Sequence, residues 1–277
     1  MLINVSTLCE NSALMGYLGE WGLAMLIEAD GKRILFDTGA GQTLINNTTL
    51  MGADLNNLDC VVLSHGHHDH TGGLHDLLKI YGSQEIIAHP AALEKKYSLG
   101  DDAGEKYIGI PHALEKLEAM GGAFRYVTEP YQITPNIMTT GEVPLVTEYE
   151  TIDPLFFTAA HNTAKLDTVP DDLGIIVTTD YGLVIFLGCA HRGMINTIRH
   201  AQNLTGREDV YGVIGGTHLF QSDEETVMLT IKELNDIGVQ YVGASHCSGP
   251  KATALMMTEM GDRFFTNNAG RRFTLPL

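Results

Sequence analysis

Four of the 12 histidines of this chain stand within six positions, in the stretch SHGHHDHTGGL at residues 64–74. Histidine is the commonest neutral metal ligand, and a carboxylate beside imidazoles supplies the negative charge that a divalent cation requires. In an extended segment alternate side chains share one side, so His65, His67 and Asp69 lie together. A turn of the chain at Thr-Gly-Gly, residues 71–73, is expected to direct the side chain of His70 toward the same side. The spacing therefore predicts two metal ions, one held by His65 and His67 and the other by Asp69 and His70.

The histidines follow a fully apolar run at 60–63, which is typical of a buried strand that ends in a loop. The same pattern recurs downstream, where apolar runs end at His89, at Cys189 with His191, at His218 and at His246. Helical patterns lie at 194–204 and 224–237, between the later strands. Strands that carry polar residues at their ends and alternate with helices indicate an α/β protein with its site along one edge of a sheet.

The rest of the sequence fits one large domain. An Asp30-Gly31 turn signal joins apolar runs at 23–27 and 34–36, which predicts a β-hairpin. Residues from about 90 to 140 are rich in Gly and charge, with a short helix near 113–120, and we expect a covering excursion there. The whole chain, 1–277, is expected to form a single domain.

Composition restricts the class of partner. The 34 acidic and 17 basic residues give a formal net charge of −17, which argues against nucleic acid as a ligand. No apolar stretch approaches the ~18 residues of a membrane span, and the four widely spaced cysteines suit a reducing compartment. We expect a cytoplasmic protein that does not contact a membrane, acts on a small-molecule substrate and, from base rates for enzymes, forms a homodimer.

Several motifs resemble those of the metallo-β-lactamase superfamily. They are FDTG at 36–39, SHGHHDHTGGL at 64–74, GCAHRGMINTI at 188–198, GGTHL at 215–219 and SHCSG at 245–249. The pattern, with TTGEVP at 139–144, is most similar to the branch of dihydropterin-ribofuranosylaminobenzene-phosphate synthase-like metal-dependent hydrolases. The resemblance implies a four-layer αβ/βα sandwich, in which two sheets pack face to face, helices lie outside and the metals sit at one edge.

The resemblance also implies the remaining ligands. His246 matches the C-terminal ligand of the family, and we assign it to the second metal. The chain departs from the family in the middle, where no GHT motif occurs and Cys189 follows the strand in place of a bridging aspartate. We therefore expect His191 as the third ligand of the first metal, with Cys189 as a thiolate ligand, a close neighbour or a small core residue. His161 is the alternative third ligand.

Other residues are expected to support the site. Asp37 is predicted to orient a ligand histidine, and Asp69 to orient or deprotonate the attacking water as well as to bind metal. Four residues are candidates for contact with substrate, although core, loop or exposed positions are alternatives for each of them: His218, His89, Arg192 and Lys251. His75, His112 and His200 have no converging partner in the sequence and are expected at the surface.

The chemistry that follows is hydrolysis by a dinuclear centre. Two divalent cations lower the pKa of a shared water and stabilise an oxyanion, and imidazole and carboxylate ligands suit zinc, with manganese or iron as alternatives. We expect hydrolysis of an ester, in particular a small phosphorylated or cyclic phosphate substrate. The alternatives are the synthase-like activity of the branch, iron-dependent persulfide oxidation and a noncatalytic sensing module that retains its metals.

Overall fold

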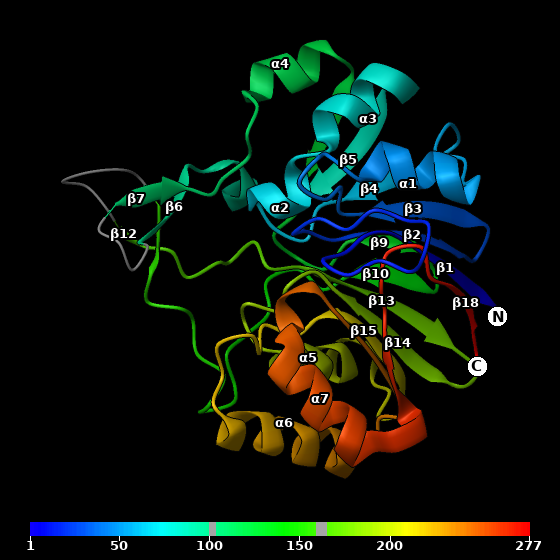
Figure 1. Ribbon diagram of the computed structural model, residues 1–277, viewed down its shortest axis with the longest axis vertical. Coiled ribbons are helices and arrows are strands. Elements are labelled where there is room, and N and C mark those ends of the chain that lie inside the picture. Colours follow the sequence, from blue (N-terminus) through cyan, green and yellow to red (C-terminus); the bar gives the residue numbers. More distant parts are fainter. Residues whose placement is uncertain (100–103, 159–164) are drawn as a thin grey trace.

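A computed structural model describes residues 1–99, 104–158 and 165–277. Its helices and strands alternate in the order that the apolar runs predict, and most strands join one of two seven-stranded sheets (Figure 1). The two sheets lie face to face, and the helices cover their outer faces.

The first sheet has the strand order β18-β1-β2-β3-β4-β5-β8. The predicted hairpin is present as β2 and β3, and its turn uses Asp30 and Gly31 with φ of 52° and 71°. Positive φ at both central residues is what a type I′ turn requires, and Asp and Gly tolerate it best. The strands are β1 (Ile3–Cys9), β2 (Ala24–Ala29), β3 (Lys32–Phe36), β4 (Cys60–Val62), β5 (Gln84–Ala88), β8 (Gly122–Tyr126) and β18 (Arg272–Leu275).

The second sheet has the order β17-β16-β15-β14-β13-β10-β9. Its strands β14, β15 and β16 are parallel, so their carboxyl ends meet at one edge. The strands are β9 (Gln132–Thr134), β10 (Ile137–Thr139), β13 (Gly174–Thr179), β14 (Gly182–Leu187), β15 (Val210–Gly216), β16 (Tyr241–Ser245) and β17 (Phe264–Thr266).

Helices cover the outer face of each sheet. Those over the first sheet are α1 (Leu44–Met51), α2 (His68–Thr71), α3 (Leu74–Tyr81) and α4 (Leu114–Ala119), and those over the second are α5 (Met194–Thr205), α6 (Glu224–Ile237) and α7 (Gly249–Met260). The helical spacing at 194–204 and 224–237 is confirmed by α5 and α6.

Alternation along the strands explains the layers. In β14, Val184 and Phe186 join the core between the two sheets, whereas Leu183, Ile185 and Leu187 join the core beneath α5, α6 and α7. Side chains alternate along a strand, so an unbroken apolar run fits a strand that is buried on both faces. The four-layer αβ/βα sandwich is therefore confirmed.

A third, four-stranded sheet stands apart from the sandwich, in the order β12-β11-β6-β7 (Figure 1). Its strands are β6 (Lys96–Leu99), β7 (Glu105–Tyr107), β11 (Phe156–Thr158) and β12 (Lys165–Leu166). The expected excursion at about 90–140 is thus too broad, because β8, β9 and β10 belong to the two large sheets. Of the described strands in that range only β6 and β7 leave the sandwich, and β11 and β12 join them in the third sheet.

Two further observations bear on the sequence expectations. All four cysteines are free and buried. Among the described residues, no helix is both long enough and apolar enough to cross a bilayer.

Candidate metal centre

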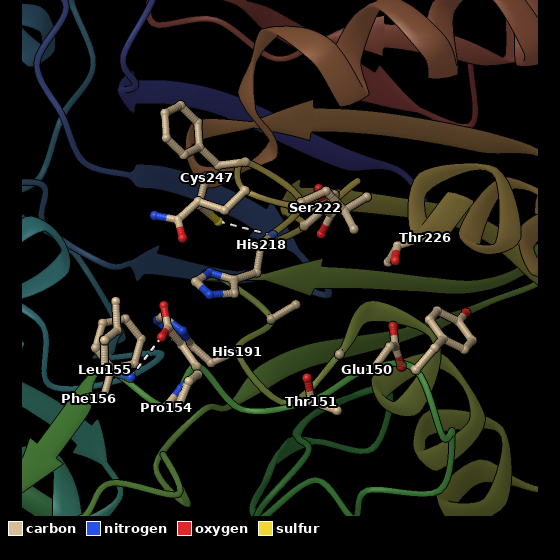
Figure 2. Close-up of a pocket in the computed structure, with 18 of the residues that line it drawn as sticks. Glu150, Thr151, Pro154, Leu155, Phe156, His191, His218, Ser222, Thr226 and Cys247 are labelled. Atoms are coloured by element: carbon tan, nitrogen blue, oxygen red, sulfur yellow. Dashed lines mark hydrogen bonds between the residues drawn. The ribbon is translucent and has the colours of Figure 1, made fainter. Parts of the chain in front are cut away.

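A cavity of about 550 Å³ opens beside the carboxyl ends of β14, β15 and β16 (Figure 2). Its lining combines aromatic side chains with two of the strand-end histidines, namely Trp21, Tyr149, Phe156, Phe220, His191 and His218. Figure 2 shows Phe156 toward one side of the cavity and Thr226 toward the other, with the two imidazoles between them. The cavity gives a small molecule access to the residues that the sequence singles out.

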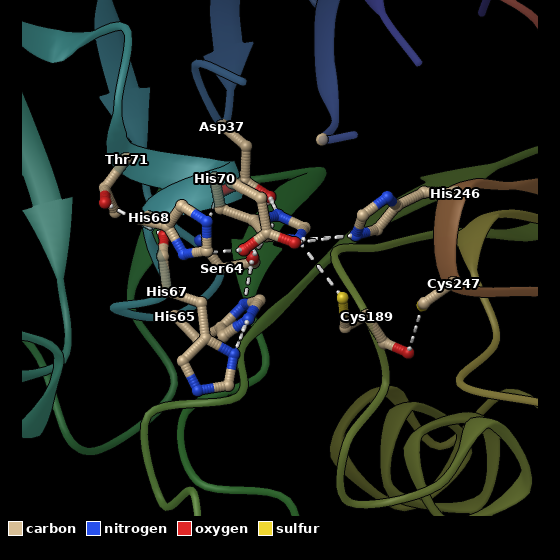
Figure 3. Close-up of polar contacts among 12 residues, drawn as sticks. Asp37, Ser64, His65, His67, His68, His70, Thr71, Cys189, His246 and Cys247 are labelled. Carbon is tan, nitrogen blue, oxygen red and sulfur yellow. Dashed lines mark hydrogen bonds and ion pairs between the residues drawn. The ribbon is translucent and has the colours of Figure 1, made fainter. Parts of the chain in front are cut away.

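The histidine-rich stretch and the ends of β14 and β16 converge at this place (Figure 3). On the side of His65, three ring nitrogens crowd together. Nε2 of His65 lies 3.0 Å from Nδ1 of His67 and 3.1 Å from Nε2 of His191. His65, His191 and the thiol of Cys189 offer donor atoms that all lie within 4.8 Å of one another. All of these residues are buried.

A second group adjoins the first. Nε2 of His70 lies 3.1 Å from Sγ of Cys189 and 3.2 Å from Nε2 of His246. The carboxylate of Asp69 reaches the same point, with Oδ2 at 3.2 Å from Nε2 of His246. The set His70, Cys189 and His246 also has its donor atoms within 4.8 Å, so Cys189 belongs to both groups.

The protonation of these groups fits a bound cation. Burial, with the neighbouring imidazoles, holds the pKa of His65 and of His191 well below the ordinary value, and burial lowers the pKa of His67 to about 3. These rings are neutral at pH 7, so each can offer a ring-nitrogen lone pair to a cation, and the nitrogens that face one another stand about 3 Å apart. In a tetrahedral zinc site with Zn–N of about 2.0–2.1 Å the nitrogens stand roughly 3.3 Å apart, close to the spacing here.

The second group is more strongly charged. Burial opposes ionisation of His70, but the carboxylates of Asp37 and Asp69 outweigh it and raise the pKa of His70 to about 9. Burial also opposes ionisation of Asp69, yet the charges of His70 and His246 hold its pKa below the ordinary value. Burial, with the neighbouring Cys247, raises the pKa of the Cys189 thiol. A metal ion bound here would displace protons from His70 and Cys189.

Hydrogen bonds orient three of the imidazoles so that Nε2 is left free. Asp37 accepts from Nδ1 of His70 at 2.6 Å, and its other contacts come from the amide and hydroxyl of Ser64. Because the Ser64 hydroxyl donates to Asp37, it accepts from Nδ1 of His65, 2.9 Å away. The side-chain oxygen of Asn11 accepts from Nδ1 of His246 at 2.9 Å. Such outer contacts fix the tautomer and aim of metal-binding histidines.

Sequence reasoning missed Asn11 and its neighbour Glu10. Oε1 of Glu10 accepts from the backbone N–H of His246 at 2.6 Å, and the Asn11 amide donates to the carbonyl of the same residue. Both residues lie in the segment between β1 and β2, far from His246 along the chain. That segment carries no motif or periodicity, so no signal in the sequence points to them.

The backbone at the site is strained in several places. Asp37, Ala190, His218 and His246 all have positive φ, between 50° and 62°. Non-glycine residues in this region persist only where the surrounding structure holds them, and they cluster at functional sites. Gly188 shows how closely the elements approach, because a Cβ there would stand 2.1 Å from Oγ of Ser64.

A buried cluster of one lysine and two aspartates contacts the backbone of the histidine-rich loop. Nζ of Lys96 lies 2.7 Å from Asp167 and 2.9 Å from Asp171, and all three side chains are at most 2% exposed. The other oxygen of Asp171 accepts from the backbone N–H of Gly66, at 2.8 Å, between two of the candidate ligands. Since Lys96 lies on β6, the cluster ties the third sheet to the metal loop.

Of the four candidate substrate contacts, only His218 lines the cavity, where its ring stands 4.2 Å from that of His191 between centroids. His89 does not, because Nδ1 accepts from the amide of Ala91 and Nε2 contacts Glu142. The expectation for Arg192 is corrected, since its guanidinium donates to the carbonyls of Val143 and Thr168. Lys251 is exposed on α7 and absent from the lining among the described residues, which fits the alternative of an exposed charge and not a substrate contact.

The remaining histidines differ from expectation in part. His161, the alternative ligand, lies outside the described residues. His75 and His112 do have a partner, because their rings stack on each other with centroids 4.6 Å apart. His200 donates from Nε2 to the carbonyl of Thr140 at 2.9 Å. The sequence could not reveal these contacts, since each joins separate elements.

Comparisons with known proteins identify the family. The sequence model of the metallo-β-lactamase superfamily matches residues 22–191. The chain is 32% identical to the 7,8-dihydropterin-6-methyl-4-(β-D-ribofuranosyl)-aminobenzene-5′-phosphate synthase of Methanocaldococcus jannaschii, over 97% of this chain and 95% of that protein. It is similar in structure to Tm1679, described as a metal-dependent hydrolase of the β-lactamase superfamily, with a TM-score of 0.85, 28% identity and 98% of both chains covered. The chain therefore belongs to the metallo-β-lactamase superfamily.

Proposed function

We propose that this protein is a hydrolase that uses two divalent cations, in the first instance zinc, to cleave a small phosphate ester. The observation that carries the proposal is the position of Cys189, whose thiol belongs to two groups of buried imidazoles at once. A thiolate shared between two cations would hold them close together, which suits catalysis by a two-metal centre. Thiolate and imidazole ligands favour zinc over magnesium or calcium.

The ligands divide between the two ions as their distances suggest. His65, His67 and His191 would hold the first, and Asp69, His70 and His246 the second, with Cys189 shared. When bound, the two cations supply Lewis acidity and bring the pKa of a water molecule near neutrality. Oδ2 of Asp69 lies 3.2 Å from Nε2 of His246, and this carboxylate is the group that we propose to orient that water and accept its proton.

The lining of the cavity bears on where a phosphate would bind. Among the described lining residues there is no Lys or Arg, so the cations would be the strongest positive charges available to it, beside the imidazole of His218. A phosphoryl group would therefore contact the cations directly. The word phosphate in the name of the relative from Methanocaldococcus jannaschii agrees with this class of substrate, and the description of Tm1679 as a metal-dependent hydrolase agrees with the type of reaction.

A second candidate is the reaction of that relative. The two sequences are 32% identical over 97% of this chain, and this similarity favours a shared activity. An assay for the product that the relative's name gives separates the two candidates, because a dedicated synthase would form that product and leave simple phosphate esters intact.

The experiment that tests the proposal measures metal content and activity together. Purified protein is analysed for zinc, manganese and iron and assayed on a panel of phosphate monoesters, cyclic phosphodiesters and carboxylic esters, before and after treatment with a chelator. We expect hydrolysis that the chelator abolishes and that zinc restores. Protein that hydrolyses no phosphate ester on the panel after zinc loading would contradict the proposal.

Two neighbouring histidines provide a matched pair of variants. His67→Ala removes a ring that faces His65, and it should lose metal and activity together. His68→Ala removes the adjacent imidazole, at the start of α2. Its Nδ1 contacts the carbonyl of Ile108 and not the ring of His65. This variant should retain both ions and most of the activity.

A further inference from the structure

Three aromatic side chains from separate segments surround the mouth of the cavity at the metal centre. Trp21 comes from the segment between β1 and β2, Phe156 begins β11 of the third sheet, and Phe220 follows β15. The rings of Trp21 and Phe220 meet edge to face, with centroids 5.6 Å apart. We call these three residues the aromatic collar.

The collar contacts the candidate ligands of both metals. The Trp21 ring lies 5.0 Å from that of His246, in the second group. The Phe156 ring lies 5.1 Å from that of His67 and 5.4 Å from that of His191, in the first group. Trp21 therefore lies beside the second group of candidate ligands and Phe156 beside the first, and both rings line the cavity that adjoins them.

Two members of the collar are half exposed. Trp21 is 49% and Phe220 50% accessible to solvent, although both could bury large apolar surfaces. Exposed apolar side chains that gather beside a pocket mark a place where a ligand covers them. Flat aromatic faces favour a flat aromatic partner, because offset stacking and edge-to-face contact add to the energy of burial.

The cavity beyond the collar has no Lys or Arg among its described lining residues. Its two carboxylates already accept hydrogen bonds, Glu150 from the amides of Ile195 and Asn196 and Asp153 from the amide of Leu155. The rest of the polar lining at this end consists of uncharged side chains such as Thr226, Ser222 and Gln221. With two carboxylates and no Lys or Arg among its described lining residues, this end disfavours an anionic organic group.

From this geometry we infer that the substrate carries a planar, uncharged aromatic group, which stacks in the collar while its anionic end meets the cations. The inference rests on the proposed function and narrows it to aryl esters of phosphate. Trp21 is then a residue that determines specificity, because its indole contacts the aromatic part of the substrate and not the reacting phosphorus.

Kinetics on two probes test the inference. Zinc-loaded protein should hydrolyse phenyl phosphate with a lower KM than ethyl phosphate. Trp21→Ala should raise KM for phenyl phosphate roughly ten-fold, with little change in kcat or in the KM for ethyl phosphate. Trp21→Phe should restore most of the loss. Equal KM values for the two probes in the wild type, or an equal rise for both in Trp21→Ala, would overturn the inference.

Trp21 is the only tryptophan of the chain, so its fluorescence reports binding without turnover. In the zinc-loaded protein, phenylphosphonate should change the emission of Trp21, and methylphosphonate at the same concentration should not. Phe220→Ala keeps the reporter and should weaken the response to phenylphosphonate. Tyr181→Ala is a control, because Tyr181 is exposed in the turn before β14, at the opposite end of that strand from Cys189.

The two measurements separate the inference from the proposed function. A selective response to phenylphosphonate without hydrolysis of any phosphate ester would support the collar and contradict the hydrolase. Hydrolysis with the same fluorescence response to both phosphonates, or with no response to either, would support the hydrolase and overturn the collar.

Discussion

The sulfur of Cys189 lies 3.1 Å from Nε2 of His70 and also belongs to the group of His65 and His191. This position follows from the end of β14, where Cys189 comes two residues after the last residue of the strand. The superfamily pattern that the sequence resembles has a bridging aspartate here. Cys189 occupies a position from which one side chain can contact both candidate ions.

Replacing Cys189 tests whether the thiol is shared. Cys189→Ala should reduce the metal content from two ions per chain to one and lower kcat/KM by at least roughly ten-fold. Cys189→Asp, which restores an anionic ligand, should recover the second ion. Cys60→Ala removes another buried thiol, on β4 in the core between the sheets, and should keep the metal content unchanged. Elemental analysis after gel filtration measures all three variants.

Asp37 is expected to control the second ion. It accepts from Nδ1 of His70 at 2.6 Å, and the contact keeps Nε2 directed toward Cys189. Asp37→Asn should weaken binding of the second zinc ion by roughly 10–100-fold, because such outer contacts tune ligand histidines by that amount. Competition with a chromophoric chelator gives the affinity. An unchanged affinity in Asp37→Asn would show that the contact has no part in metal binding.

The stability of metal-free protein should depend on pH through His70. The folded pKa of His70 is raised to about 9, so its contribution is fully present below the unfolded value of about 6.5 and is lost as the pH rises through about 9. Chelator-treated protein should lose roughly 3 kcal/mol of unfolding free energy between about pH 6.5 and pH 9. Denaturant titrations measure the change, which Asp37→Asn should reduce. A stability that rises over this range would contradict the prediction.

The Lys96 cluster should contribute strongly to stability. Lys96→Met leaves Asp167 and Asp171 buried without their cation, and the loss of one partner of a buried ion pair costs about 3–5 kcal/mol. Urea denaturation should show this decrease. Lys32→Met is the matched control, because Lys32 pairs with Asp59 at the surface and its loss should leave the midpoint nearly unchanged. Equal effects of the two substitutions would refute the role of burial.

Much of the architecture could be predicted from the sequence because its signals are local. The apolar run at 60–63 reflects a strand that is buried on both faces, and it corresponds to β4. The helical spacing at 224–237 reflects a helix that is buried on one face, and it corresponds to α6. The third sheet could not be predicted in this way. Its strands are two to four residues long and join segments about 60 residues apart, so neither periodicity nor turn signals mark them.

The residues of the site show the same difference between local signals in the sequence and contacts between distant segments. The clustering of His65, His67, Asp69 and His70 within one loop is visible in the sequence, and the strand ends point to Cys189, His191 and His246. Asn11, Glu10 and the aromatic collar depend on packing between segments that carry no pattern. Arg192 shows the opposite error, because adjacency to His191 suggested a substrate contact, but the turn there directs its guanidinium to the carbonyls of Val143 and Thr168.

The central claim is that two cations share the thiol of Cys189. The most direct measurement is anomalous diffraction from crystals of zinc-loaded protein, with data collected on both sides of the zinc absorption edge. The account predicts two anomalous peaks, one among His65, His67 and His191 and one among Asp69, His70 and His246, each in contact with the sulfur of Cys189. A single peak, or two peaks that do not both contact that sulfur, would contradict it.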